Sequence, residues 1–99
     1  MRAYELNRQF HMTLLDAAKN RYLTKSVNAL QKTLLILGPS TVLEPARAQQ
    51  AIAEHHELLV ALKIRDGVQS EALMRAHIEA AHRVRLKTLR GRERPITAI

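Results

Sequence analysis

The sequence predicts an all-α fold, a small antiparallel bundle of about four helices, and three observations support this prediction. Apolar residues recur at three- and four-residue steps in four stretches, no stretch alternates as a half-buried strand does, and Gly, Pro or Asn separate the stretches. The connections are short, so consecutive helices are expected to run antiparallel. The 99 residues suffice for one small domain, and they contain no internal repeat or low-complexity segment.

The first two helices are expected at residues 2–19 and 22–37. The apolar stripe of the first comprises Leu6, Phe10, Leu14 and Ala17 or Ala18. Asn20 is expected to stop this helix or to be a left-handed residue at its end, and a new helix can start close by. The second helix carries the most regular packing stripe of the chain, expected to be purely structural, which comprises Leu23, Val27, Leu30, Leu34 and Leu37. Gly38 and Pro39 are expected to end it, because proline cannot continue the hydrogen-bond ladder.

The third helix is expected from Ala46 to Asp66, after Pro45 in its first turn, with Asp66 and Gly67 closing it. Its inward face is predicted to hold Ile52, His55, Leu59 and Leu62, while Glu54, Glu57 and Arg65 lie elsewhere on its surface. The fourth helix is expected from about Val68 to Leu89 and ends near Gly91 and Pro95. Its predicted inward residues are Leu73, Met74, His77, Ala81 and Val84. The expected domain covers residues 1–94, followed by a frayed tail at 95–99.

Composition excludes several classes of protein. There is no cysteine, so disulfides and thiolate metal sites are ruled out, and any metal ion must be held by nitrogen and oxygen. No apolar run is long enough to cross a bilayer, and the polar start after Met1 is not a signal peptide. We therefore expect a cytoplasmic protein without a membrane partner.

The formal net charge of +7 is concentrated near the end of the chain. Six Lys or Arg against one acid, Glu93, lie between Arg83 and Arg94, and the rest of the chain is nearly balanced. Cationic residues near a helix C-terminus are also favoured by the helix dipole, and solvated basic tails are common. Nucleic-acid binding by this segment is therefore a minor alternative, since only three aromatic residues could supply stacking.

Three histidines and an amide occupy the apolar faces of three different expected helices. Asn7 and His11 are one helical turn apart, so both side chains can reach one point from the same helix. His55 and His77 face inward from two later helices. A lone inward histidine is more often a hydrogen-bonded core residue than a ligand, but four such groups together could surround an ion within a bundle.

The chemistry of this set favours a divalent transition metal. Three imidazoles and one oxygen suit Zn²⁺ or Ni²⁺ first, with Mn²⁺ or Fe²⁺ held less tightly. Such a site leaves coordination positions open, which a small carboxylate could fill. His56 and His82 are expected at the surface or the rim, because they are rotated away from the inward positions.

Two segments of the chain carry motif residues in order. The first runs from Asn7-Arg8-Gln9-Phe10-His11 to Leu23, and follows the pattern D/N-x-x-F-H-x-x-L-x-x-A-x-x-N-x-x-L. The second contains Glu54-His55, Asp66 and Met74-Arg75-Ala76-His77-Ile78. Together these segments, which cover roughly residues 3–85, resemble the FCD domain, the C-terminal effector-binding module of FadR-type regulators in the GntR family of transcription factors.

The resemblance implies a ligand-sensing helical domain that is not an enzyme. It would bind a metal ion through Asn7, His11, His55 and His77, bind a small organic acid as its effector, and form a homodimer. Asn7 stands where the family often has Asp, so the ion should be held more weakly or depend more on an added anion. The winged helix-turn-helix and the opening helices of the family are expected to be missing, so that DNA would be bound only through a domain absent from this chain.

Two alternatives remain open at this point. One is a metal-free helical interaction or dimerisation domain whose histidines satisfy one another. The other is a metal-dependent enzyme, since three histidines on an open metal ion also form a catalytic shell. The sequence offers no evident general base for it, because Glu54, Glu57 and Asp16 are expected off the inward face.

Overall fold

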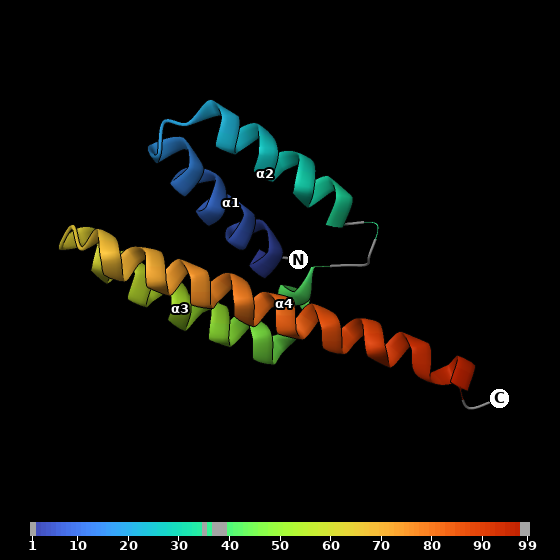
Figure 1. The fold of residues 1–99 in the computed structure, drawn as a ribbon. Helices are drawn as coiled ribbons and strands as arrows, with labels where there is room; N and C mark the ends of the chain where they lie inside the picture. The colour runs from blue at the N-terminus through green and yellow to red at the C-terminus, as the bar shows by residue number, and fades with distance from the viewer. Residues whose placement is uncertain (1, 35, 37–39, 98–99) are drawn as a thin grey trace. The chain divides into compact units, whose positions relative to one another are not determined.

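The fold was analysed in a computed structural model, which describes residues 2–34, 36 and 40–97, with side chains up to Gly91. The described part consists of four α-helices and a short 3-10 helix, with no strand, which confirms the predicted all-α class (Figure 1). The chain divides into two compact units, Met1–Leu43 and Glu44–Ile99. Each unit is a helical hairpin. No helix among the described residues is both long enough and apolar enough to span a membrane.

The first unit pairs α1 (Arg2–Ala17) with α2 (Arg21–Leu34) and adds the 3-10 helix η2 (Thr41–Leu43). Lys19 makes the turn after α1 with a positive φ of 54°. Asn20 then caps α2, because its Oδ1 accepts a hydrogen bond from the backbone N–H of Leu23 at 3.1 Å. Asn20 is therefore the cap of the second helix, and the left-handed residue is Lys19.

The apolar stripe of α2 is less buried than the sequence predicts. Leu23, Leu30 and Leu34 are 44%, 62% and 47% exposed, and only Val27 is half-buried. The expectation that this stripe packs within the bundle is therefore wrong for these three leucines. Leu37, Gly38 and Pro39, which were expected to complete and end this helix, lie outside the described residues.

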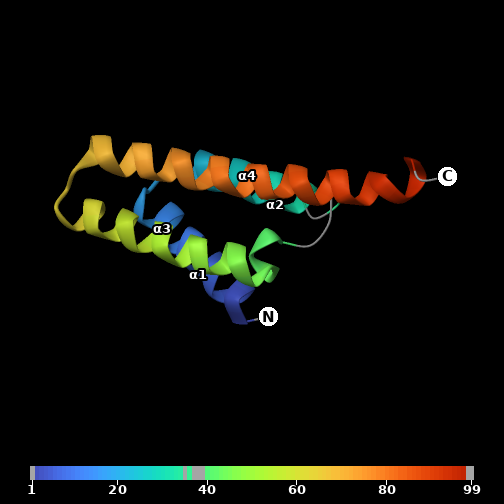
Figure 2. The same ribbon diagram turned by 90° about the horizontal axis from the view of Figure 1, so that it is seen from below.

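The second unit pairs α3 (Pro45–Lys63) with α4 (Gly67–Thr97) in an antiparallel hairpin (Figure 2). Arg65 turns the chain with a φ of 59°. The backbone N–H groups of Arg65 and Asp66 bond the carbonyls of Leu62 and Ala61, the pattern of a Schellman cap. Asp66 also caps α4, because its Oδ1 accepts from the N–H of Gln69 at 3.0 Å.

The inward face of α3 differs from the predicted one. Ile52, Leu59 and Leu62 are 59%, 48% and 41% exposed, so the prediction that they face inward is wrong. The buried residues of α3 follow a different stripe, with steps of three, four or seven residues, and comprise Arg47, Ala51, Leu58 and Ala61. Glu54 lies on this same stripe and is half-buried, which corrects its expected place on the outer surface.

The register of α4 agrees with the prediction. Leu73, Met74, Ala81 and Val84 are half-buried and His77 is buried, at 5% exposure. The helix continues past its expected end near Leu89, because a single glycine such as Gly91 weakens a helix by only about 1 kcal/mol and does not forbid it. Residues 98 and 99 of the expected frayed tail lie outside the described residues.

Candidate metal centre

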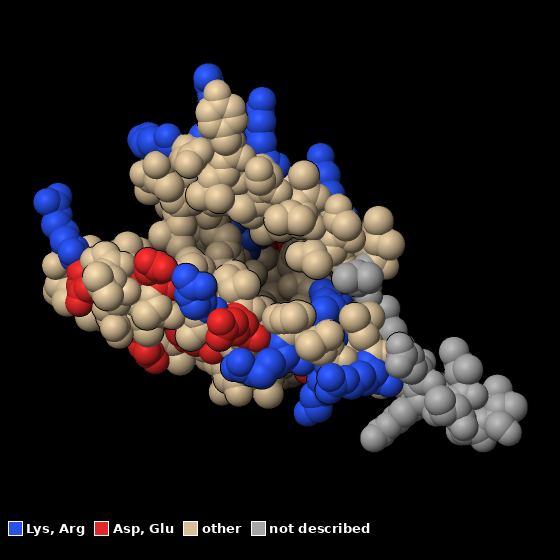
Figure 3. All heavy atoms as spheres, in the orientation of Figure 1, with Lys and Arg blue, Asp and Glu red and all other residues tan. Residues whose placement is uncertain are grey.

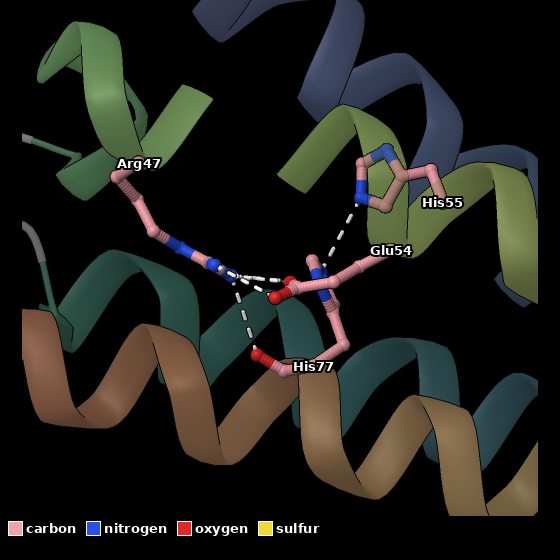
Figure 4. Close-up of polar contacts among 4 residues, drawn as sticks. All are labelled: Arg47, Glu54, His55 and His77. Carbon is pink, nitrogen blue, oxygen red and sulfur yellow. Dashed lines mark hydrogen bonds and ion pairs between the residues drawn. The ribbon is translucent and has the colours of Figure 1, made fainter. Parts of the chain in front are cut away.

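The structure brings His55 of α3 and His77 of α4 together inside the second unit (Figure 4). Their Nε2 atoms lie 3.3 Å apart, and the rings meet edge to face with centroids separated by 4.7 Å. His55 is half-buried and His77 is buried. Both imidazoles therefore aim the same ring nitrogen at one place beside the α3–α4 interface.

The other ring nitrogen of His77 is held by a carboxylate. Nδ1 of His77 lies 2.6 Å from Oε1 of Glu54, the residue that precedes His55 on α3. An ionised carboxylate can only accept, so the proton of a neutral His77 belongs on Nδ1 and the lone pair on Nε2. The lone pair of His77 is thus directed toward His55.

Arg47 completes a buried network around this carboxylate. Its Nη1 donates to Glu54 Oε2 at 3.1 Å and its Nη2 to Glu54 Oε1 at 2.9 Å, a bidentate ion pair. Nη2 also donates to the backbone carbonyl of His77 at 3.4 Å and lies 3.5 Å from Nδ1 of that residue. Because Nδ1 already carries a proton toward Glu54, it has no lone pair for Arg47. Arg47 is only 2% exposed, so Glu54 is its charge partner.

The Glu54 carboxylate is kept ionised by this network. Burial alone would raise the pKa of Glu54, but the hydrogen bonds from Arg47 and His77 and the positive charge of Arg47 outweigh it and hold the pKa below its ordinary value of 4.5. The charge of Glu54 is therefore matched by Arg47.

The spacing of the two histidines fits one ion. Two nitrogens about 2.1 Å from a common ion lie about 3.0 Å apart at an octahedral angle and about 3.4 Å apart at a tetrahedral one. The 3.3 Å between the Nε2 atoms falls within this range. A carboxylate on the second nitrogen of a ligating histidine is also a common feature of metal sites, because it fixes the tautomer and the ring orientation.

Asn7 and His11 belong to the first unit, one turn apart on α1. Phe10 packs edge to face against the His11 ring, with centroids 5.5 Å apart. Oδ1 of Asn7 is buried and has no hydrogen-bond partner among the described residues. An orphaned buried acceptor of this kind fits an oxygen ligand for a cation. His56 and His82 are both exposed, as the sequence predicts.

Sequence reasoning missed Arg47 and misplaced Glu54. A signal for both was present, because Arg47, Ala51, Glu54, Leu58 and Ala61 follow one another at steps of four, three, four and three residues. Opposite charges two helical turns apart lie on one face of the helix, where two long side chains can meet. The more apolar stripe on the same helix, formed by Ile52, His55, Leu59 and Leu62, suggested a different inward face.

A second surface of the unit is basic. Figure 3 shows Lys and Arg side chains gathered along the second half of α4, where Arg83, Lys87 and Arg90 are exposed. The described histidine pair lies nearer the middle of the hairpin. The basic surface is therefore distinct from the candidate metal centre.

The second unit is thus a helical hairpin of the all-α class with a candidate metal centre. The chain belongs to the FCD domain family, because the family model matches residues 1–80. This confirms the resemblance found in the sequence and suggests the effector-binding role of a regulator domain. Comparisons with curated proteins and with solved structures gave no match.

Proposed function

We propose that this chain is the ligand-sensing domain of a GntR-type regulator, which binds a divalent metal ion and a small organic acid, forms a homodimer and acts in the cytoplasm. The observation that carries the proposal is the pair of Nε2 atoms 3.3 Å apart, one of them on a histidine whose other nitrogen is held by Glu54. Family membership supports the sensing role.

The proposed ligands are Asn7, His11, His55 and His77. Each of the three histidines offers a ring nitrogen of the kind that holds a metal ion. The buried, unpartnered Oδ1 of Asn7 supports an oxygen ligand from the first unit. This donor set suits Zn²⁺ or Ni²⁺ first and Mn²⁺ or Fe²⁺ less well. When bound, the ion supplies an electrostatic anchor with open positions for an anion.

Charge around the site supports an acidic effector. All four proposed ligands are neutral, and the nearby Glu54 carboxylate is already paired with the buried Arg47. The protein therefore offers no net negative charge to balance a divalent cation. A small carboxylate would supply that charge and fill the open positions, so a hydroxy acid or a citrate-like acid fits this site.

The dimer is supported by the apolar surface of α2. Leu23, Leu30 and Leu34 are all more than two-fifths exposed and lie on one face of the helix. A second copy of the chain would remove this surface from water, as homodimers commonly do. Ligand binding could then shift the balance between dimer geometries, which is how such a domain would signal.

The test is thermal unfolding of protein stripped with a chelator. Adding Zn²⁺ or Ni²⁺ should raise the melting temperature, and a ligand at a hundred times its Kd stabilises by about 2.7 kcal/mol. Citrate should add to the shift only in the presence of the ion. His77→Ala should abolish both shifts, whereas His82→Ala, a change to an exposed histidine of the same helix, should leave them intact.

Three results would favour other functions. If the shifts in melting temperature persist in His77→Ala, the ion binds elsewhere and this site is excluded. If Zn²⁺ and Ni²⁺ leave the melting temperature of the wild type unchanged, a metal-free interaction domain is favoured. Turnover of simple esters would favour an enzyme, although both oxygens of Glu54 already accept hydrogen bonds from Arg47 or His77.

A further inference from the structure

We infer that Glu54 and Arg47 are the positioning residues of the metal centre: Glu54 fixes the tautomer and orientation of His77, and Arg47 fixes Glu54. This inference rests on the proposed function, since it concerns the same site. It assigns a role to two residues outside the proposed ligand set.

The first step concerns the proton of His77. A free imidazole distributes its proton between two nitrogens, and only the nitrogen without the proton can bind a metal ion. The contact of 2.6 Å from Nδ1 to Glu54 Oε1 is a charge-assisted hydrogen bond that places the proton on Nδ1. Glu54 therefore selects the tautomer whose lone pair lies on Nε2, next to His55.

The second step concerns the ring itself. His77 has 5% exposure, and its Nδ1 is tied to α3 through Glu54 while its backbone belongs to α4. Rotation of the ring would break this bond and bury an unpaired donor, which is costly. The carboxylate thus holds Nε2 at the place where it meets His55. It also increases the electron density on Nε2, which strengthens that nitrogen as a ligand.

The third step concerns Arg47, whose two terminal nitrogens each bind a different oxygen of Glu54. The planar guanidinium thereby fixes the plane of the carboxylate as well as its position. The additional bond from Nη2 to the His77 carbonyl ties the same guanidinium to α4. A lysine could keep the charge but could not bond both oxygens in this way.

The experiment combines side-chain NMR with metal titration. In chelator-treated wild-type protein labelled with ¹⁵N-histidine, His77 should show a protonated Nδ1 and an unprotonated Nε2. In Glu54→Gln this preference should weaken, and Zn²⁺ affinity, measured by competition with a chromophoric chelator, should fall about 10- to 100-fold. Arg47→Lys should give a smaller loss. Glu57→Gln, an exposed change one turn along the same helix, should match the wild type.

The outcomes separate this inference from the proposed function. A wild-type His77 that carries its proton on Nε2 overturns the inference, and this measurement holds even if a variant folds poorly. Unchanged Zn²⁺ affinity in a folded Glu54→Gln protein also overturns it, while the proposed function stands. A wild-type protein that binds no Zn²⁺ or Ni²⁺ refutes the proposed function, and the proton on Nδ1 still decides the role of Glu54 toward His77.

Discussion

Removing the Glu54 carboxylate should destabilise the protein mainly through the arginine that it leaves behind. Arg47 is 2% exposed and its Nε is buried without a hydrogen-bond partner among the described residues. After Glu54→Leu, Arg47 keeps no charged partner in this network and only two long contacts from Nη2, to the His77 carbonyl at 3.4 Å and to His77 Nδ1 at 3.5 Å. Breaking a buried ion pair on one side typically costs about 3–5 kcal/mol.

We expect Glu54→Leu to lower the free energy of unfolding by about 3 kcal/mol, the low end of that range. The low end applies because the Glu54 side chain is 28% exposed, so water already screens part of the attraction. The measurement is urea unfolding of chelator-treated protein followed by circular dichroism. Glu57→Leu is the control and should change the free energy of unfolding by no more than about 0.5 kcal/mol.

A double variant separates the lost attraction from the cost of the stranded charge. Arg47→Met together with Glu54→Leu replaces the ion pair by apolar groups, which is often neutral or stabilising. The double variant should therefore be more stable than Glu54→Leu alone. If Glu54→Leu proves as stable as the wild type, Arg47 reaches water in solution and the argument from its burial is refuted.

The remaining predictions concern packing, a turn, pH and the ion. Leu58→Ala should cost about 2–4 kcal/mol in urea unfolding, since Leu58 is 3% exposed, whereas Leu59→Ala at 48% exposure should cost under about 1 kcal/mol. Arg65→Gly should stabilise by about 0.5–1 kcal/mol, because glycine adopts the observed φ of 59° without strain; a loss of stability would contradict this. Because the pKa of Glu54 is lowered in the folded state, its stabilising contribution is complete above the ordinary value of 4.5 and is lost as the pH falls through the folded value. The free energy of unfolding of the chelator-treated wild type should therefore fall more in acid than that of Glu54→Gln. Asn7→Asp should tighten Zn²⁺ binding and reduce its dependence on citrate, and isothermal titration with and without citrate checks both effects.

The helices could be predicted from the sequence because the residue types near their ends favour the start or the end of a helix. Pro45 occupies the first turn of α3, as expected from its ring, whereas Asp66 was expected to close the third helix and instead caps the fourth. The inward residues of α4 were also predictable, because charged residues alternate with a single apolar stripe around His77. The left-handed residues, Lys19 and Arg65, were not predictable, since neither is a residue type that favours positive φ.

The register of α3 could not be predicted from periodicity, because apolar residues surround much of this helix. Ile52, Leu59 and Leu62 form one stripe, and Ala51 and Leu58 belong to another. The structure buries the stripe that contains Ala51 and Ala61, whose small side chains allow α3 and α4 to pack closely around the Arg47–Glu54 ion pair. Which stripe faces α4 depends on tertiary contacts that a single helix does not encode.

The same register of α3 explains how a histidine and a carboxylate from this helix both reach His77. His55 lies at the edge of the buried stripe and Glu54 lies on it, one position earlier, so the two side chains reach His77 from different sides. Glu54 contacts Nδ1 of His77, and His55 lies next to Nε2 of the same ring. A register with Ile52, Leu59 and Leu62 inward would turn Glu54 toward solvent and remove the carboxylate from His77. The register of α3 that buries Arg47 and Glu54 beside His77 therefore leaves the apolar stripe of Ile52, Leu59 and Leu62 exposed. The contact of this stripe with water is unfavourable, and the network that orients His77 is formed at that cost.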